Sequence, residues 1–134
     1  MGTKMKTENK HEVVTASNDD VQSASGYASR LAASGNYSQL AASGNYSQLA
    51  ASGYASKLAA SGYASKLAAS GDYSIAMSAG LRSRAKAGVD GCIALTWHDG
   101  SRYRVSVGYV GEDLRAETWY ALDDKGEFVE VSHE

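Results

Sequence analysis

The chain has 134 residues, a net charge of −2 and one cysteine, Cys92. This length suits one ordinary domain or two small ones, and the small net charge gives no overall field of the kind that drives nucleic-acid or membrane binding. A single cysteine excludes an internal disulfide framework and favours a reducing cytoplasm, while the absence of a long apolar run and of an apolar N-terminal signal region argues against a membrane span or secretion.

The first part of the chain has no strong pattern of its own. Residues 1–7 are expected to be a disordered leader, as chain ends commonly are. Residues 8–25 keep only fragments of the repeat that follows them. Because a stack of strands must be covered at its open ends, we expect residues 8–25 to form an N-terminal cap or a degenerate first coil.

A nine-residue repeat fills residues 26–88. Gly recurs every nine residues from Gly26 to Gly80, Ser follows each of these glycines by three positions, and Leu follows the first five by five positions. Self-similarity at a fixed period is the mark of a solenoid. A helix does not fit, because nine residues at about 100° each would place successive leucines on opposite sides of it. The repeat therefore predicts one short strand and one corner per nonapeptide.

The alternation within each repeat indicates which side chains face inward. In "SKLAA", Ser, Leu and the second Ala share one face of a strand, and Lys and the first Ala share the other. Such small inward residues would not fill a broad triangle of three nonapeptides. They favour a flattened coil of two nonapeptides, or 18 residues, while a coil of 27 residues remains the alternative. Six tyrosines follow the repeat glycines, and we expect them to stack at the corners and cover the thin core.

The C-terminal segment, residues 89–134, has a different composition. It contains four stretches with strand-like alternation, "GCIALTW", "RYRVSVGYV", "RAETWYAL" and "EFVEV", separated by Gly- and Asp-rich turns. Together these stretches predict an antiparallel meander that is too small to be very stable alone and so caps the last coil. The predicted fold class is all-β: a parallel β-solenoid of nonapeptide repeats over residues 26–88, capped by a C-terminal β-meander.

Charge is divided unevenly between these two parts. Residues 26–88 carry six basic residues and one acidic residue, whereas residues 89–134 carry four basic and ten acidic residues. Two explanations remain open for the basic side chains: a solvated face that discourages edge-to-edge aggregation, or a docking strip for a protein partner. The second predicts partner-binding residues that alternate along strands: Arg82, Arg84, Lys86, Arg102 and Arg104. The acidic C-terminal segment argues against direct nucleic-acid binding.

Aromatic residues of the C-terminal segment suggest self-association. The segment holds both tryptophans, more aromatic surface than one thin solenoid end can bury. We therefore expect a homodimer or other homo-oligomer through outward aromatics of this region, namely Trp97, Tyr109, Trp119 and Tyr120.

Catalytic and metal-binding patterns are weak throughout. Cys92 and His98 would lie about 20 Å apart along one strand, which argues against a nucleophile–base pair with Asp99. The repeats contain one acid, Asp72, so no calcium array is expected, and the three histidines are too scattered for zinc. No phosphate-binding loop or dinucleotide fingerprint occurs. The sequence predicts no enzyme activity, no metal and no cofactor.

Two resemblances suggest a biological setting. The stretch "GDYSIAMSAGLRSRAKAG" resembles the β-roll head repeats of trimeric autotransporter adhesins, which supports a solenoid. The nonapeptide array, followed by "SRAKAGVDGCIALTW" and "AETWYALDDKGEFVEV", is similar to uncharacterised proteins frequent in phages and prophages. That resemblance implies a phage or prophage origin and no particular activity.

The leading functional hypothesis is a non-enzymatic protein-interaction module in the cytoplasm of a bacterial host. In that setting it would inhibit a host antiphage defence complex, such as a CRISPR effector. The alternatives are a structural or assembly component, for example a phage particle part or an oligomeric scaffold, and an ice- or surface-binding solenoid.

Overall fold

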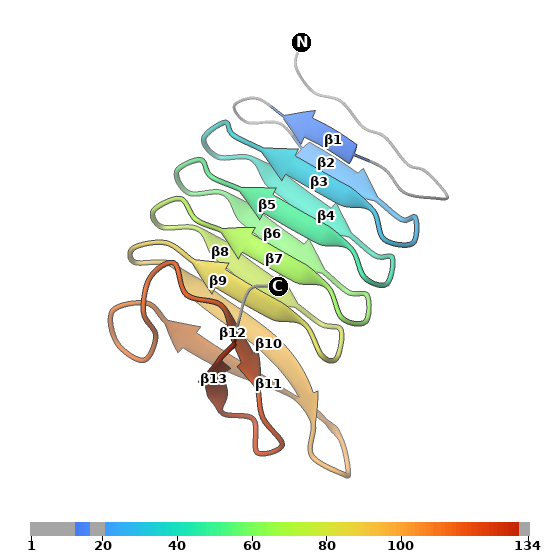
Figure 1. Cartoon of the computed structure of the whole chain (residues 1–134), viewed down its shortest axis with the longest axis vertical. Helices are drawn as coiled ribbons and strands as arrows, with labels where there is room; N and C mark the ends of the chain where they lie inside the picture. The colour runs from blue at the N-terminus through green and yellow to red at the C-terminus, as the bar shows by residue number, and fades with distance from the viewer. Residues whose placement is uncertain (1–12, 17–20, 132–134) are drawn as a thin grey trace.

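The computed structural model describes residues 13–16 and 21–131, which form an all-β structure without a helix. Nine four-residue strands lie in two facing layers and wind about a common axis (Figure 1). They are β1 Val13–Ala16, β2 Val21–Ala24, β3 Arg30–Ala33, β4 Gln39–Ala42, β5 Gln48–Ala51, β6 Lys57–Ala60, β7 Lys66–Ala69, β8 Ile75–Ser78 and β9 Arg84–Ala87. The predicted β-solenoid is therefore confirmed.

Successive strands alternate between two parallel layers. Sheet A has the strand order β1-β3-β5-β7-β9-β12-β13, and sheet B has the order β11-β10-β8-β6-β4-β2. In sheet A, Leu31 is in register with Leu49, and in sheet B, Leu40 is in register with Leu58. Both pairs are 18 residues apart, so two nonapeptides make one coil and the 27-residue alternative is excluded.

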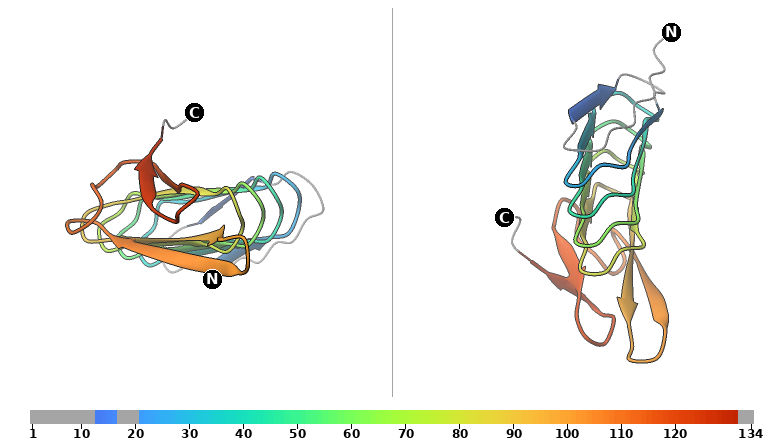
Figure 2. Two further views of the ribbon diagram at one scale, coloured as in Figure 1. Left: turned by 90° about the horizontal axis from the view of Figure 1, so that it is seen from below. Right: turned by 90° about the vertical axis from the view of Figure 1, so that its right-hand side faces the viewer.

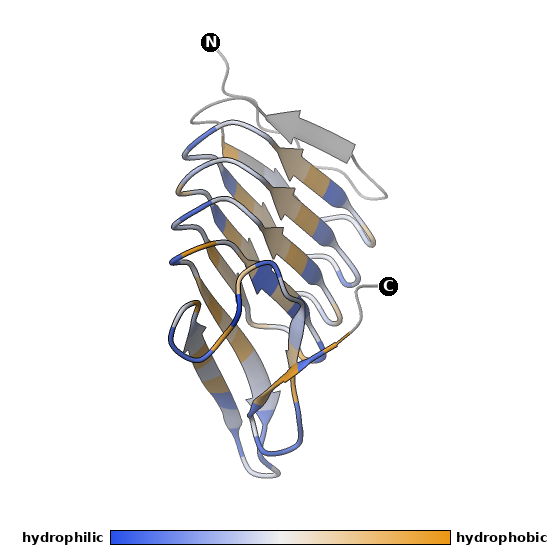
Figure 3. Ribbon diagram, turned by 60° about the vertical axis from the view of Figure 1, so that its left-hand side comes forward, coloured by the Kyte–Doolittle hydropathy of each residue, from blue (hydrophilic) through white to orange (hydrophobic). Residues whose placement is uncertain are grey.

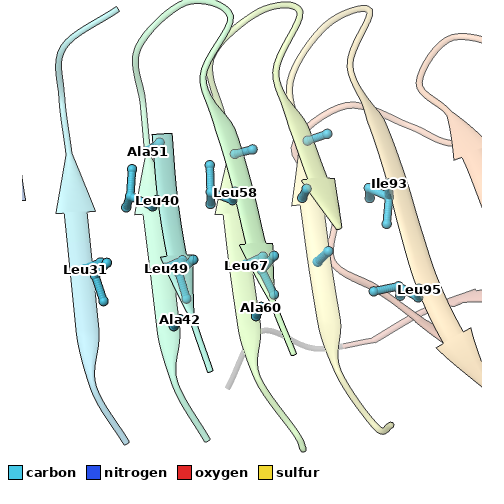
Figure 4. Packing of buried hydrophobic residues seen from close by; sticks show 14 of the residues in the cluster. Leu31, Leu40, Ala42, Leu49, Ala51, Leu58, Ala60, Leu67, Ile93 and Leu95 are labelled. Carbon is cyan, nitrogen blue, oxygen red and sulfur yellow. The ribbon is translucent and has the colours of Figure 1, made fainter. Parts of the chain in front are cut away.

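The core is a narrow layer of small side chains between the sheets. Leucines of both sheets point into this layer and form rows along the solenoid axis (Figure 4), and each is at most 2% exposed: Leu31, Leu40, Leu49, Leu58 and Leu67. The repeat serines are buried beside them. The hydroxyl of Ser29, for example, donates a 2.8 Å hydrogen bond to the carbonyl of Gly26. The predicted inward face of Ser, Leu and the second Ala is confirmed.

The corners explain the period of the glycines. A Cβ atom on Gly62 would lie 2.1 Å from the carbonyl oxygen of Gly44 in the preceding coil, so the stacked backbones leave no room for a side chain. The residue two positions after each repeat glycine has a positive φ, including Tyr37, Ala64 and Arg82. Corner tyrosines stack edge to face in two columns, with ring centroids 5.4 to 5.9 Å apart.

The C-terminal strands are β10 Cys92–His98, β11 Tyr103–Tyr109, β12 Tyr120–Leu122 and β13 Phe128–Glu130. They do not form the single continuous meander that the sequence suggested. The hairpin β10–β11 extends sheet B, because β10 pairs with β8 in parallel. The hairpin β12–β13 extends sheet A, because Tyr120 pairs with Ala85 of β9. Each sheet thus ends in its own antiparallel hairpin, and the two hairpins lie on opposite layers (Figure 2).

The hydropathy of the ribbon follows this arrangement. Hydrophobic segments lie within the strands, and hydrophilic residues lie at most corners and turns (Figure 3). At the other end of the solenoid, β1 pairs with β3 and β2 pairs with β4, so the described part of residues 8–25 continues both sheets as a coil. The expected leader, residues 1–7, lies outside the described residues.

Candidate interaction surface

The two outer faces of the solenoid differ in charge. The outward positions of sheet A carry Arg30, Lys66, Arg84 and Lys86, whereas the same positions in β2, β4, β6, β8 and β10 of sheet B carry one charged residue, Lys57. This difference arises because alternate nonapeptides belong to opposite sheets. Copies that look equivalent in sequence therefore build one basic face and one nearly neutral face.

The outer face of sheet B is flat, neutral and made of small or apolar side chains. One row of outward residues runs across six strands in register: Ser23, Ala41, Ala59, Met77, Ala94 and Val107. With strands about 4.8 Å apart and outward positions about 6.8 Å apart, three such rows cover about 24 Å by 14 Å. This area is in the range of the apolar patches that commonly mark interaction sites.

Relief on this face comes from a few longer side chains. Met77 is 49% exposed and Val105 is 62% exposed, while short alanines lie between and beside them. The result is a shallow apolar groove of about 610 Å³, whose lining includes Ala41, Ala59, Met77, Ala94, Thr96 and Val105. A groove with so few polar groups can be covered by another protein at a small desolvation cost.

Strand β11 places its apolar side chains on the outside. Tyr103, Val105, Val107 and Tyr109 are 65%, 62%, 47% and 50% exposed. Ser106 and Gly108 face inward instead, where the Ser106 hydroxyl donates a 2.7 Å hydrogen bond to the carbonyl of Gly126. A Cβ atom on Gly108 would lie 2.7 Å from Leu114 Cδ1, so only a very small residue fits on that side. The outer face of β11 continues the neutral face of sheet B.

The five predicted partner-binding residues do not form one strip. Arg82 lies in a corner with a φ of 62°, and not in a strand with Arg84 and Lys86 as the alternation suggested. Arg82 and Arg84 line a cleft of about 370 Å³ that also includes the acidic residues Asp123 and Asp124. The Lys86 ammonium lies 5.4 Å from the centroid of the Trp119 ring, at a distance typical of a cation–π contact.

The other two basic residues belong to the β10–β11 hairpin. Arg104 forms an ion pair with Asp99, and Arg102 is exposed beside the turn. The Arg104 hydrogen bond, followed by backbone N–H bonds from Arg102 and Ser101, holds the pKa of the Asp99 carboxyl well below its usual range. Neither Arg102 nor Arg104 lines the cleft of Arg82 and Arg84. A role for any of the five in partner binding stays a prediction.

Of the four aromatics predicted at an oligomer interface, one is fully on the surface. Tyr120 is 4% exposed, so the expectation that it points outward is wrong: its ring packs in the core, and its hydroxyl accepts a 2.8 Å hydrogen bond from the Arg115 N–H. Trp97 is partly buried against Gly126, and Trp119 is partly buried over Lys86. Tyr109 is exposed, and the structure adds Tyr103, Val105 and Val107 beside it.

Sequence alternation contained the signal for these additional residues. "RYRVSVGYV" separates apolar from polar side chains along β11, but alternation does not say which face is covered. Because Leu114 and Phe128 occupy the inner side, the small residues face inward and the large ones face solvent.

Cys92 and His98 lie at opposite ends of β10, as expected from their separation. Partial burial raises the pKa of the Cys92 thiol, which keeps it protonated and weakly nucleophilic near neutral pH. Within residues 13–16 and 21–131, no three His, Cys, Asp or Glu side chains lie together in a way that could hold a metal ion. The same part of the chain has no helix long and apolar enough to cross a membrane.

Comparisons with known proteins return no relative for this chain. No protein-family model matches it, and neither the curated proteins nor the solved structures include a significant match. The functional argument therefore depends on the surfaces described above.

Proposed function

We propose that this chain is a non-enzymatic protein-interaction module that binds its partner with the outer face of sheet B. The observation that supports this proposal is the neutral apolar face that runs across six strands and contains the groove beside Met77. Exposed apolar surface of this extent favours burial against another protein.

Rigidity of the solenoid supports the same proposal. Each coil is joined to its neighbours by parallel strand pairs and by corner hydrogen bonds such as Tyr46 N–H to the Tyr63 carbonyl, at 2.8 Å. Alanine and serine side chains on the face also have little conformational freedom to lose. A rigid surface of short side chains loses little entropy when it is covered, which favours affinity.

A finer proposal concerns the setting. The resemblance to phage and prophage proteins supports a phage-encoded module that acts in the cytoplasm of a bacterial host and inhibits an antiphage defence complex, such as a CRISPR effector. In that complex the basic residues Arg82, Arg84 and Lys86, with Arg102 and Arg104 nearby, would act at the rim of the contact. Charged rims mainly set association rates and specificity.

Variants of matched alanines test this proposal. Ala59 and Ala50 occupy the same position in adjacent nonapeptides and are both exposed, but Ala59 lies on sheet B and Ala50 on sheet A. The chain is expressed in bacteria whose CRISPR immunity targets an infecting phage, and plaque formation is counted. We expect wild type and Ala50→Glu to restore plaques and Ala59→Glu to fail, with folding verified by circular dichroism.

Other outcomes separate the two levels of the proposal. Equal plaque formation with both folded variants would contradict a role for the face of sheet B. No effect of wild type in any defence-proficient strain would remove the inhibitor proposal, while leaving protein binding by this face to be tested by crosslinking.

A further inference from the structure

We propose that two copies of this chain form a dimer by antiparallel pairing of their β11 strands, which joins the two copies of sheet B into one continuous sheet. The proposed occupant of the free edge of β11 is thus a second copy of the chain. This inference goes beyond the proposed function, because it requires no other protein and concerns the edge of sheet B and not its outer face.

The backbone of β11 has hydrogen-bonding groups directed away from β10. The Asp99 N–H donates to the Arg102 carbonyl at 3.1 Å, and the Val110 N–H donates to the Gly91 carbonyl at 2.9 Å. In an antiparallel ladder every second residue bonds to the same neighbour. Residues 104, 106 and 108 therefore bond to β10, and Tyr103, Val105 and Val107 direct their N–H and C=O groups toward the other edge.

No described strand covers that edge. β11 is the terminal strand of sheet B, and it pairs with β10 alone. The β12–β13 hairpin contacts the inner side of β11, through the Ser106 bond to Gly126 and through Leu114 and Phe128 beside Gly108. Viewed along the solenoid axis from below, β11 lies at the end of the stack, with the β12–β13 hairpin beside it on the other layer (Figure 2, left).

The two C-terminal edges of the solenoid differ in a way that favours pairing at β11. The edge strand of sheet A, β13, has three residues and includes Glu130, so it is short and charged. β11 has seven residues, no proline and an apolar outer row. Short, charged edge strands prevent edge-to-edge association, whereas long apolar edges promote it. Sheet A is protected against edge pairing at this end, and sheet B is not.

The edge of β11 is complementary to itself under a twofold axis. Antiparallel pairing centred on Val105 joins Tyr103 to Val107 of the second copy and Val105 to its own counterpart, which satisfies the N–H and C=O groups of all three residues. Their apolar side chains then meet across the outer face, where such cross-strand pairs are stabilising. The antiparallel order also directs Arg102 of each copy toward the acidic turn of the other, which contains Glu112 and Asp113.

The mass of the full chain in solution tests the dimer. Light scattering should give twice the 14.1 kDa of one chain at about 200 µM, and a lower mass on dilution as mass action requires. Val105→Pro removes one N–H that points to the free edge and leaves the bonds to β10, since proline is compatible with an edge strand. We expect one chain's mass for Val105→Pro and a dimer for the matched control Val105→Thr, which keeps the N–H.

Amide exchange locates the contact without a variant. In wild type, the amides of Tyr103, Val105 and Val107 should exchange at least about tenfold more slowly at high than at low protein concentration, because pairing protects them. The amides of Arg104, Ser106 and Gly108 should be protected at all concentrations, which reports an intact hairpin.

Three results would overturn the proposal: a single-chain mass for wild type at 200 µM, a dimer whose Tyr103, Val105 and Val107 amides exchange at the same rate at all concentrations, or a folded Val105→Pro variant that still dimerises. The substitution Ala59→Glu lies away from β11 and should leave the dimer mass unchanged. Loss of partner binding in that variant with an intact dimer therefore distinguishes the two proposals.

Discussion

Replacing Gly62 by alanine should destabilise the solenoid far more than a single added methyl group suggests. The new Cβ atom would lie 2.1 Å from the Gly44 carbonyl oxygen and 2.5 Å from its carbonyl carbon. Ordinary contact begins near 3.4 Å. The two coils must therefore separate by about 1 Å at this corner, in a stack whose spacing is about 4.8 Å.

That separation stretches hydrogen bonds that flank the corner. The Tyr46 N–H bond to the Tyr63 carbonyl is 2.8 Å long, and the Ser61 N–H bond to the Ala42 carbonyl is 3.1 Å long. Both would exceed the usual range, and each contributes about 0.5 to 1.5 kcal/mol. Overpacking strain adds about 1 to 3 kcal/mol. We expect Gly62→Ala to lower the free energy of unfolding by about 3 kcal/mol.

A reverse substitution two residues later provides the control. Ala64 has a φ of 57°, a conformation that glycine adopts without strain. Ala64→Gly relieves about 1 kcal/mol of strain and gives back a similar amount through the more flexible unfolded chain, so stability should change by less than about 0.5 kcal/mol. Urea unfolding followed by circular dichroism measures both variants. A loss below about 1 kcal/mol for Gly62→Ala, or an equal loss for Ala64→Gly, would refute the corner-stacking argument.

Three further predictions concern the core, the hairpin turn and the cap. Leu58, at 1% exposure, should cost about 3 kcal/mol in urea unfolding when changed to alanine, whereas Lys57→Ala should cost less than about 0.5 kcal/mol; similar losses would contradict the assigned burial. The Asp99 carboxyl, whose pKa is lowered by Arg104, should remain ionised at about pH 3 by NMR; its contribution to stability is present above the unfolded-state pKa and is lost as pH falls through the folded-state value, and titration in the usual range would contradict the ion pair. Removal of residues 89–134 should expose the last strands of both sheets and cause aggregation, whereas a soluble monomer with unchanged thermal unfolding would show that the cap is an independent domain.

Much of the solenoid could be predicted because its repeat is tied directly to geometry. A phase of nine residues with inward Leu and Ser can be satisfied by a strand and not by a helix, and the small size of Leu and Ala selects the flattened 18-residue coil. The position of Arg82 was equally accessible: it follows Gly80 by two residues, as Tyr37 follows Gly35, and so belongs to a corner.

The cap was harder to predict because alternation identifies strands and not their partners. Nothing local in "AETWYAL" indicates that Tyr120 joins β9 of sheet A and enters the core. The exposure of Val105 and Val107 likewise depends on Leu114 and Phe128, which arrive later in the chain and occupy the inner side of β11. Tertiary contacts of this kind decide which face of an alternating strand is buried.

Photo-crosslinking in bacterial cells tests most directly whether the outer face of sheet B binds another protein. A photoreactive amino acid is placed at Ala59 on sheet B or at Ala50 on sheet A, and covalent products are identified by mass spectrometry, which separates self-adducts from adducts with other proteins. The account predicts an adduct with another protein from position 59 and none from position 50. Adducts from position 50 alone, or equal yields from both positions, would contradict it.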